Sequence, residues 1–297
     1  MNQQLDQLIK LAEGNRWERL RFAPGRYLYG QCFQKIVYPF SKRGFPVDIR
    51  TFWGEKMHII LPAAMDLFLL GGKTHDSELR LARFMINTLS PGDQVADIGA
   101  HYGFFSLLAA QLISSTGRIE AFEASASTHL VLDKNLSRAP QASAHHLAIS
   151  DSCGQLDFHE FPTRYTEYNT LRPEQFAEQK WFTKHPPTVH TVSTNTLDAF
   201  CEEHLFQPTF IKIDVEGAED KVIAGMSRLV TKVHPIIVME YLAGTRFNQA
   251  HQRAAQQLKD WGVHSHLINA EGHLERCDDI TAYLKASRMD SDNLVFF

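Results

Sequence analysis

The stretch "VADIGAHYGFFSLLAAQL", residues 95–112, carries two glycines, Gly99 and Gly103, where an apolar run passes into a helical pattern. A dinucleotide-binding turn has the spacing G-x-G-x-x-G, so that the pyrophosphate contacts bare backbone at a helix N-terminus. Here His101 stands at the position of the middle glycine, where its side chain would crowd a pyrophosphate. A ligand without phosphates needs only a tight turn and a few N–H donors. The spacing therefore favours S-adenosylmethionine (SAM) over a dinucleotide.

A carboxylate, Glu123, stands near the end of the next apolar run, "RIEAFEA" at residues 118–124. A carboxylate at the end of a second parallel strand can accept hydrogen bonds from both hydroxyls of a ribose. The spacing between Glu123 and the glycine turn suits this role, so we predict that Glu123 binds the ribose of the cofactor. The alternative is a solvated carboxylate at a strand end.

Two more carboxylates, Asp214 and Glu240, end the apolar runs "FIKID" and "PIIVME". The carboxyl ends of the strands in an open α/β sheet face the ligand crevice, so both side chains are expected beside the reacting centre. A hydroxyl is a poor nucleophile until its proton leaves, so a reaction at a hydroxyl needs positioning and a base or a metal. Asp214 and Glu240 are the candidate catalytic groups. Glu216 and Glu219 are explained equally well by stabilisation of a turn and of a helix N-terminus.

Histidine is the alternative base, because its side chain titrates near neutral pH. His101 in the glycine turn and His75 before a predicted helix are placed for this role, although 15 histidines in one chain weaken the case for any one of them. Two carboxylates can also hold a divalent cation, with substrate oxygens completing its coordination. Nothing in the spacing requires a metal, so we expect a metal-free mechanism and no metal site.

Alternating apolar runs and helical segments extend from residue 95 to the end of the chain, as is typical of βαβ units with a parallel sheet. The predicted strands lie in residues 95–100, 118–124, 143–150, 209–216, 235–241, 262–268 and 293–297. The helices between them are predicted near 103–113 and 126–138, through Val222 and Leu229, and from about Arg246 to Trp261. We expect an α/β fold with a mostly parallel sheet of seven strands and helices on both faces.

Two parts are expected in the chain, divided at residue 70. Residues 1–70 are predicted to be an accessory arm, basic and aromatic up to about residue 45 and followed by a β-hairpin around Gly54 and Glu55. Residues 71–297 are predicted to be the cofactor-binding domain, with an aromatic insert at about 162–188 as a lid over a ligand. We expect the arm to pack its aromatic side chains on the main domain or on a second subunit, as in a homodimer. Peripheral contact with a membrane surface is the alternative.

Composition limits the classes of protein. A net charge of −4 argues against a nucleic-acid binder, because phosphate binding needs a concentrated basic surface. The four cysteines are far apart and form neither a zinc-binding spacing nor a disulfide framework. We find neither a signal-peptide pattern nor an apolar run of the ~20 residues that a membrane-spanning helix needs. A cytoplasmic protein is expected.

Five blocks of the sequence resemble the FkbM family of SAM-dependent methyltransferases. The blocks are "DIGAHYGFFSL" at 97–107, "FEASASTHLVLDKNL" at 122–136, "LAISD" at 147–151, "TLDAF" at 196–200 and "IKIDVEGAEDKVIAGM" at 211–226. The resemblance covers about residues 70–240, in the order and spacing of the family, and does not include the arm. It implies a class I methyltransferase fold, which is Rossmann-like, and methyl transfer to a hydroxyl of a sugar, a glycan or a secondary metabolite.

The resemblance also implies which residues bind the cofactor. It places the methionine end beside the glycine turn, the ribose at Glu123 and the adenine edge at Ser150 and Asp151. The full expected set is Glu78, Asp97, Gly99, Ala100, His101, Tyr102, Gly103, Glu123, Ala124, Ser150 and Asp151. The family commonly has asparagine where this chain has His101; this departure keeps the backbone contact of the turn and leaves the role of the side chain open.

Two other functions remain open at this point. An NAD-dependent oxidoreductase can have the same type of sheet, but the absent middle glycine disfavours it. A non-catalytic SAM- or nucleotide-binding module that acts through its basic arm is the second alternative. Titration with nucleotides tests the first alternative, and product formation tests the second.

Overall fold

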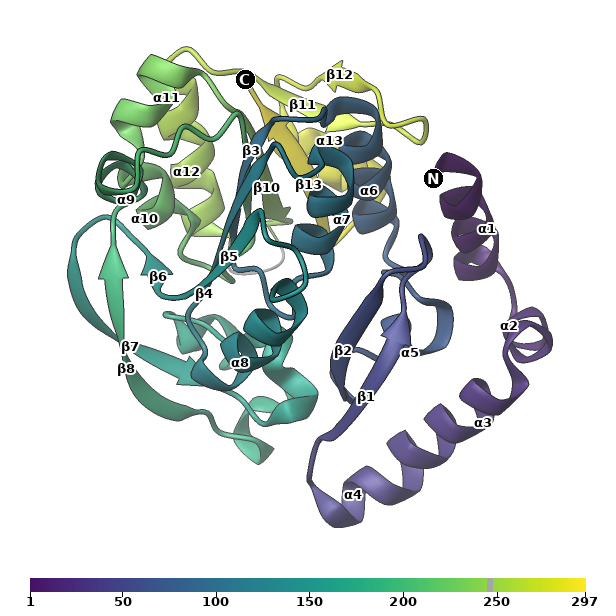
Figure 1. Cartoon of the computed structure of the whole chain (residues 1–297). Helices are drawn as coiled ribbons and strands as arrows, with labels where there is room; N and C mark the ends of the chain where they lie inside the picture. Colours follow the sequence, from purple (N-terminus) through teal and green to yellow (C-terminus); the bar gives the residue numbers. More distant parts are fainter. Residues whose placement is uncertain (245–247) are drawn as a thin grey trace.

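The computed structural model describes residues 1–244 and 248–297, and Figure 1 shows the course of the chain. The largest sheet has the strand order β12-β11-β13-β10-β9-β3-β4-β5. Strands β10, β9, β3, β4 and β5 are parallel, and β13 runs antiparallel between β10 and β11. The strands are β3 (Gln94–Ile98), β4 (Arg118–Glu123), β5 (Ala142–His146), β9 (Phe210–Ile213), β10 (Ile236–Leu242), β11 (Ser265–Ile268), β12 (Leu274–Arg276) and β13 (Ser291–Phe296). The predicted mostly parallel α/β sheet is confirmed.

Helices cover both faces of this sheet, as expected. The first face carries α6 (Asp76–Thr88), α7 (Phe104–Ile113) and α8 (Ala126–Leu136). The second face carries α9 (Leu197–Glu203), α10 (Glu219–Ala224), α11 (Ser227–Val233), α12 (Gln249–Asp260) and α13 (Ile280–Ser287). Successive side chains of a strand point to opposite faces of the sheet, so Val95 packs against the helices of the first face and Ala96 against those of the second.

The structure differs from the predicted elements at three places. The short strand β12 pairs with β11, so the largest sheet has eight strands among the described residues, where seven were expected. The run at 143–150 divides, because β6 (Ala148–Ile149) leaves the large sheet and pairs with β8. The predicted helix through Val222 and Leu229 is two helices, α10 and α11. They part at Gly225, where a Cβ would lie 2.1 Å from the Ser150 carbonyl oxygen.

The predicted helix from about Arg246 to Trp261 agrees with α12 over the residues that the structure describes. Its described part is α12, and the expected first residue, Arg246, lies outside the described residues. Across the described part of the chain, no helix is both long and apolar enough to cross a membrane.

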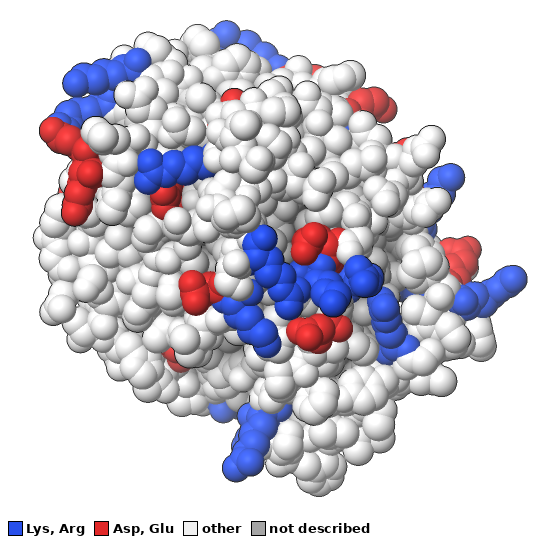
Figure 2. All heavy atoms as spheres, in the orientation of Figure 1, with Lys and Arg blue, Asp and Glu red and all other residues white. Residues whose placement is uncertain are grey.

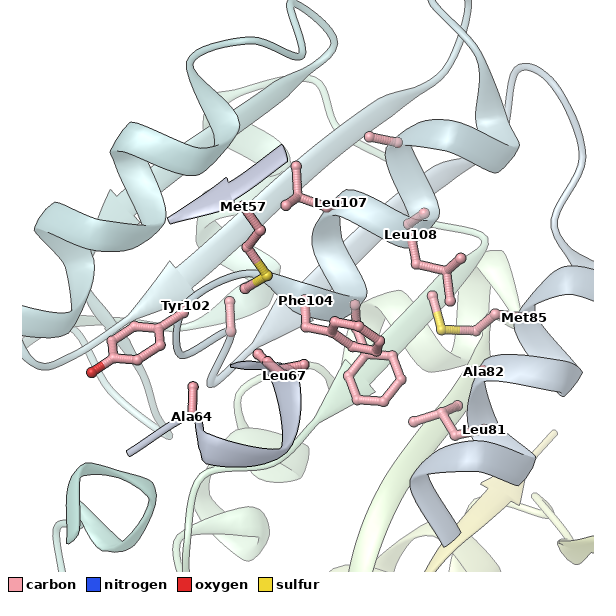
Figure 3. Close-up of a cluster of buried hydrophobic side chains, with 14 of the residues drawn as sticks. Met57, Ala64, Leu67, Leu81, Ala82, Met85, Tyr102, Phe104, Leu107 and Leu108 are labelled. Carbon is pink, nitrogen blue, oxygen red and sulfur yellow. The ribbon is translucent and has the colours of Figure 1, made fainter. Parts of the chain in front are cut away.

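The N-terminal residues form an extended arm of helices and then the predicted hairpin. The arm consists of α1 (Asn2–Glu13), α2 (Arg16–Phe22), α3 (Pro24–Cys32), a π-helical turn (Phe33–Val37) and α4 (Tyr38–Ser41). The hairpin pairs β1 (Phe45–Arg50) with β2 (Lys56–Leu61), and α5 (Met65–Leu70) follows it. Leu5 and Leu8 of α1 are buried in the same core as the hairpin. Figure 3 shows part of this core, where Met57 and Leu67 lie close to Phe104 of α7.

The aromatic insert connects two strands of a smaller, three-stranded sheet. Strands β7 (Gly154–Glu160) and β8 (Thr188–Asn195) are antiparallel, and the insert between them contains 3₁₀ helices at Thr163–Tyr168, Pro173–Phe176 and Phe182–Lys184. Trp181 stacks on Tyr165 with a centroid distance of 4.6 Å. This aromatic packing gives the insert a small core of its own.

Candidate functional site

A cavity of about 580 Å³ opens at the carboxyl ends of β3, β4, β9 and β10. Parallel strands bring the residues that follow them to one edge of a sheet, so segments far apart in the sequence meet there. Other walls come from α5, the start of α6 and the segment before it, residues 147–149, the start of β13 and the 3₁₀ helix Thr163–Tyr168 of the insert. The predicted catalytic residues Asp214, Glu240 and His101 all line this cavity.

The glycine turn is fixed by its contact with the neighbouring strand end. Gly99 has a φ of 77°, and an added Cβ would lie 1.8 Å from the Asp214 carbonyl oxygen, so only glycine fits. The amides of Gly99 and Ala100 both donate to the Phe122 carbonyl, each over 3.0 Å. His101 follows with a φ of 50°, which is uncommon for a residue with a side chain. The turn therefore holds the ends of three strands together at the cavity.

The two candidate histidine bases both line the cavity. Burial lowers the pKa of His101 to about 4, and its Nε2 lies 3.1 Å from the Thr166 hydroxyl. The expectation that His101 titrates near neutral pH is therefore wrong, because the protein around the ring disfavours its charged form. His75 precedes α6, and its Nδ1 lies 2.9 Å from the Ser77 hydroxyl.

Glu123 ends β4 beside the glycine turn. Its two carboxylate oxygens accept hydrogen bonds from the amides of His101 and Ser125, each over 2.9 Å. Burial nevertheless raises the pKa of Glu123 to about 7. The two amides leave this pKa near 7, so the charged form of Glu123 is only partly stabilised in the free protein. Each further hydrogen-bond donor from a ligand would stabilise that charged form.

Asp214 follows β9 and is paired with a buried lysine. The Lys212 ammonium lies 3.3 Å from the Asp214 carboxylate and 3.5 Å from that of Asp97. Burial opposes the charge on Lys212, but the two aspartates outweigh it and raise the lysine pKa. Asp97 in turn accepts a 2.6 Å hydrogen bond from Ser106 at the start of α7. This chain of contacts fixes the Asp214 side chain at the edge of the cavity.

Glu240 lies on β10, close to Asp214. Burial and the Asp214 charge together raise the pKa of Glu240 to about 7, although a hydrogen bond with Ser291 opposes the shift. Asp214, Glu216 and Glu240 each offer a carboxylate oxygen, and these oxygens lie within 4.8 Å of one another. The described residues therefore provide three oxygen ligands that can hold a divalent cation, with Lys212 already beside one of them.

The insert closes one side of the cavity through ionic and hydrogen-bonding contacts. Lys73 lies 3.1 Å from Glu78 of α6 and 3.2 Å from Glu167 of the insert. Burial opposes the charge on Lys73, but these carboxylates raise its pKa well above the ordinary value. The Thr170 hydroxyl donates to the Glu216 carbonyl, so the insert also contacts the turn after β9. The insert is thus joined to two other walls of the cavity.

The cavity is lined by an excess of acidic side chains. Among the described residues, it is lined by two lysines, Lys73 and Lys212, and by eight carboxylates: Asp66, Glu78, Glu123, Glu167, Asp214, Glu216, Glu240 and Asp290. An acidic cavity attracts a cationic group such as a sulfonium and repels a pyrophosphate. This charge distribution agrees with the preference for SAM over NAD that the glycine turn indicates.

Most of the predicted cofactor-binding residues line the cavity, namely Glu78, Gly99, Ala100, His101, Tyr102, Glu123 and Ala124. The four others do not. The Asp97 carboxylate is turned into the protein, and Gly103 caps α7 at a φ of 84° against the Leu132 side chain. Ser150 is buried behind the wall and Asp151 is exposed, so the three residues before them, 147–149, line the cavity instead.

Several residues of the cavity wall were missed from the sequence. Lys212 stands inside the motif "IKID". A lysine in an otherwise apolar strand needs an acidic partner, and this is the signal that could have identified it. Lys73 stands in "GGKTHDSE", directly before the predicted helix. Asp66 and Glu167 belong to α5 and to the insert, and neither has a sequence signal that relates it to the sheet.

Comparisons with known proteins identify the family of the chain. The model of the family described as the methyltransferase FkbM domain matches residues 97–267, which is more than half of the chain. The 2-O-methyltransferase NoeI of Sinorhizobium fredii is 26% identical over 204 residues, which cover 66% of this chain and 82% of that protein.

Two solved structures are also similar. The methyltransferase FkbM of Methylobacillus flagellatus has 14% identity and a TM-score of 0.44, and the match covers 79% of this chain and 53% of that one. This chain thus spans about half the length of the Methylobacillus protein. An O-methyltransferase of Bacillus cereus in complex with SAH has 11% identity and a TM-score of 0.39, with 73% of this chain and 78% of the other covered.

Proposed function

Since the chain belongs to the FkbM methyltransferase family, a SAM-dependent family, we propose that it transfers a methyl group to a hydroxyl oxygen of a sugar, a glycan or another small metabolite. The observation that carries the proposal is the position of Asp214 and Glu240. Their carboxylates face the same cavity from neighbouring strands and lie within 4.8 Å of each other. The name of the Sinorhizobium relative, a 2-O-methyltransferase, supports oxygen as the accepting atom.

The cavity residues fit SAM. Glu123 is the residue that would bind the ribose, because its carboxylate stands at the end of β4 and its pKa is near 7. The main chain and side chains at 147–149 would border the adenine, and the glycine turn would border the methionine end. The cofactor supplies an electrophilic methyl group on a sulfonium, and the eight carboxylates around the cavity favour that positive charge.

In this mechanism Asp214 positions the acceptor hydroxyl and Glu240 removes its proton. Lys212 fixes the Asp214 carboxylate, which is then placed to accept a hydrogen bond from the acceptor hydroxyl. Glu240 has a pKa of about 7, so it is ionised in a large share of molecules at neutral pH and can take the hydroxyl proton. His101 is a weaker base, because burial lowers its pKa to about 4. The methyl transfer then needs no proton acceptor besides these side chains.

The test is replacement of each carboxylate by its amide. Asp214→Asn and Glu240→Gln keep the size of the side chain and remove its charge, so turnover should fall by about 10²–10⁴ while SAM affinity stays nearly unchanged. Glu203→Gln on the far end of α9 is the control and should retain full turnover. Methyl-labelled SAM with a panel of glycosides and alcohols measures the transfer. Full turnover in both amide variants would contradict the proposal.

Metal dependence distinguishes two forms of the mechanism. A base needs no cation, so a chelator should leave the turnover unchanged. If a chelator abolishes turnover and Mg²⁺ restores it, then Asp214, Glu216 and Glu240 are metal ligands and the metal-free form is wrong.

A further inference from the structure

The first 45 residues, which end at the start of the hairpin, expose an unusual number of large apolar side chains. Twelve large hydrophobic residues are exposed among the described residues, and eight of them lie between residues 17 and 45. They are Trp17, Phe22, Leu28, Tyr29, Ile36, Val37, Phe40 and Phe45. Single exposed apolar side chains are ordinary on a protein surface, but a cluster marks an interaction site. The arm was expected to pack its aromatic side chains on the main domain or on a second subunit; Trp17, Phe22 and Phe40 do not pack on the main domain.

The apolar residues form a stripe along one helical rod. Helix α3, the π-helical turn and α4 follow one another without a break from residue 24 to 41. Leu28, Cys32, Ile36 and Phe40 are four residues apart, so they lie along one side of this rod, and all four are exposed. Phe40 is 86% exposed and Leu28 is 63% exposed.

The other side of the rod is anchored to the protein. Gly30 and Phe33 are buried, and a Cβ on Gly30 would lie 3.0 Å from the Met65 sulfur of α5. The ring of Tyr29 lies 5.8 Å from that of Phe68, also on α5. The packing of this side on α5 therefore leaves the side with Leu28, Ile36 and Phe40 exposed to solvent.

The same segment carries a strong positive charge. Residues 14–45 contain one acidic residue, Glu18, and seven basic ones: Arg16, Arg19, Arg21, Arg26, Lys35, Lys42 and Arg43. The segment therefore has a net charge of +6 in a chain whose total is −4. All of these basic residues except Arg19 are exposed. Figure 2 shows the surface over α3 and α4, at the lower right, as mostly uncharged on this face, with blue side chains at its margins.

We propose that residues 14–45 dock the protein on the surface of an anionic lipid bilayer. Exposed apolar side chains that insert at the headgroup boundary, with lysine and arginine around them, are the features of an interfacial anchor. A second copy of the chain fits less well, because it would bring one surface of charge +6 against another. An anionic bilayer instead complements both the charge and the apolar stripe.

The docked arm has a direct structural relation to the cavity. The rod packs on α5, and Met65, Asp66 and Leu67 of α5 line the cavity wall. Docking therefore holds one wall of the cavity close to the bilayer surface. The binding itself does not depend on the identity of the acceptor or on the proposed reaction.

The experiment is flotation of the full chain with two kinds of vesicle. Vesicles of phosphatidylcholine with about one third phosphatidylserine should bind the protein at least about tenfold more strongly than phosphatidylcholine alone, and added salt should weaken this binding. The double variants Ile36→Ser with Phe40→Ser, and Arg21→Glu with Arg26→Glu, should each lose most of the binding. Leu205→Ser is the control, since Leu205 is 87% exposed but lies outside the arm.

A fluorescence measurement supplies an independent readout. Trp17 is 74% exposed, so its emission should shift to the blue when anionic vesicles are added. The shift should be absent in Trp17→Phe, which keeps the other tryptophans. Melting temperatures equal to that of the wild type show that the variants are folded.

Three outcomes would overturn the proposal. The first is absence of binding to both kinds of vesicle, and the second is anionic-vesicle binding that neither double variant reduces. The third is a dimer in light scattering that Ile36→Ser with Phe40→Ser converts to a monomer, with no vesicle binding by the wild type. In that third case the arm is a subunit interface.

Discussion

The affinity for SAM should rise with pH, because Glu123 must be ionised to accept hydrogen bonds from both ribose hydroxyls. In the free protein, burial holds the pKa of this carboxyl at about 7. Hydroxyl donors and the nearby sulfonium stabilise the charged form, so binding lowers the pKa. By linkage, a ligand that prefers the ionised form binds more tightly as the pH rises through the free pKa.

The expected size of the effect follows from the pKa. With a pKa of about 7, roughly 10% of the carboxyl is ionised at pH 6 and roughly 90% at pH 8, so the dissociation constant should fall about ninefold between them. Glu123→Gln removes the titration and leaves the ribose without a charged acceptor. Its affinity should be weaker by about 1–3 kcal/mol at pH 8 and show a smaller pH dependence.

Isothermal calorimetry at pH 6, 7 and 8 measures both effects. SAM has titratable groups of its own, but these contribute equally to the wild type and to Glu123→Gln, so the difference between the two proteins isolates Glu123. Glu203→Gln is the control, because Glu203 is exposed at the end of α9 and does not line the cavity. Equal pH slopes in wild type and Glu123→Gln, with equal affinities, would refute the assignment of Glu123 to the ribose.

Three other predictions concern the frame of the cavity. Gly99→Ala should lower the free energy of unfolding by about 3 kcal/mol or more in denaturant titrations, because the new Cβ would meet the Asp214 carbonyl at a residue with positive φ. Gly25→Ala is the control and should leave the free energy of unfolding nearly unchanged, because no atom lies within 4 Å of the Cβ position. Leu8→Ala should cost about 2–5 kcal/mol of stability in the same assay and leave SAM affinity unchanged, since Leu8 is buried in the core and does not line the cavity. Glu167→Gln weakens a partly exposed ion pair, so it should raise the SAM dissociation constant by only about two- to fivefold and speed amide hydrogen exchange in the insert. An unchanged exchange rate there would argue against the insert as a lid.

The sequence predicts the strand ends better than the other walls of the cavity. The glycine turn, Glu123, Asp214 and Glu240 were predicted to meet because parallel strands bring their carboxyl ends to one edge, and the structure places them together. Whether each performs its proposed role is for the variants above to decide.

The remaining features depend on contacts between distant segments. Lys73 contacts Glu167 across 94 positions in the chain, and neither residue has a pattern that indicates the other. The pKa of His101 depends on burial under the insert, which periodicity does not reveal. The break between α10 and α11 follows from the approach of Gly225 to Ser150, again a tertiary contact. Such contacts decide burial and charge, and local sequence patterns carry little information about them.

The most direct test of the account is mass spectrometry of glycans, lipids and small metabolites from cells with the gene and cells without it. Transfer of a methyl group to a hydroxyl predicts a compound that is one methylene heavier in the first sample, stable to mild alkali as an ether is, and absent when the gene encodes Asp214→Asn. The account is contradicted if every heavier compound is an alkali-labile methyl ester or a methylated amine, or if Asp214→Asn restores the heavier compound as fully as the wild type does.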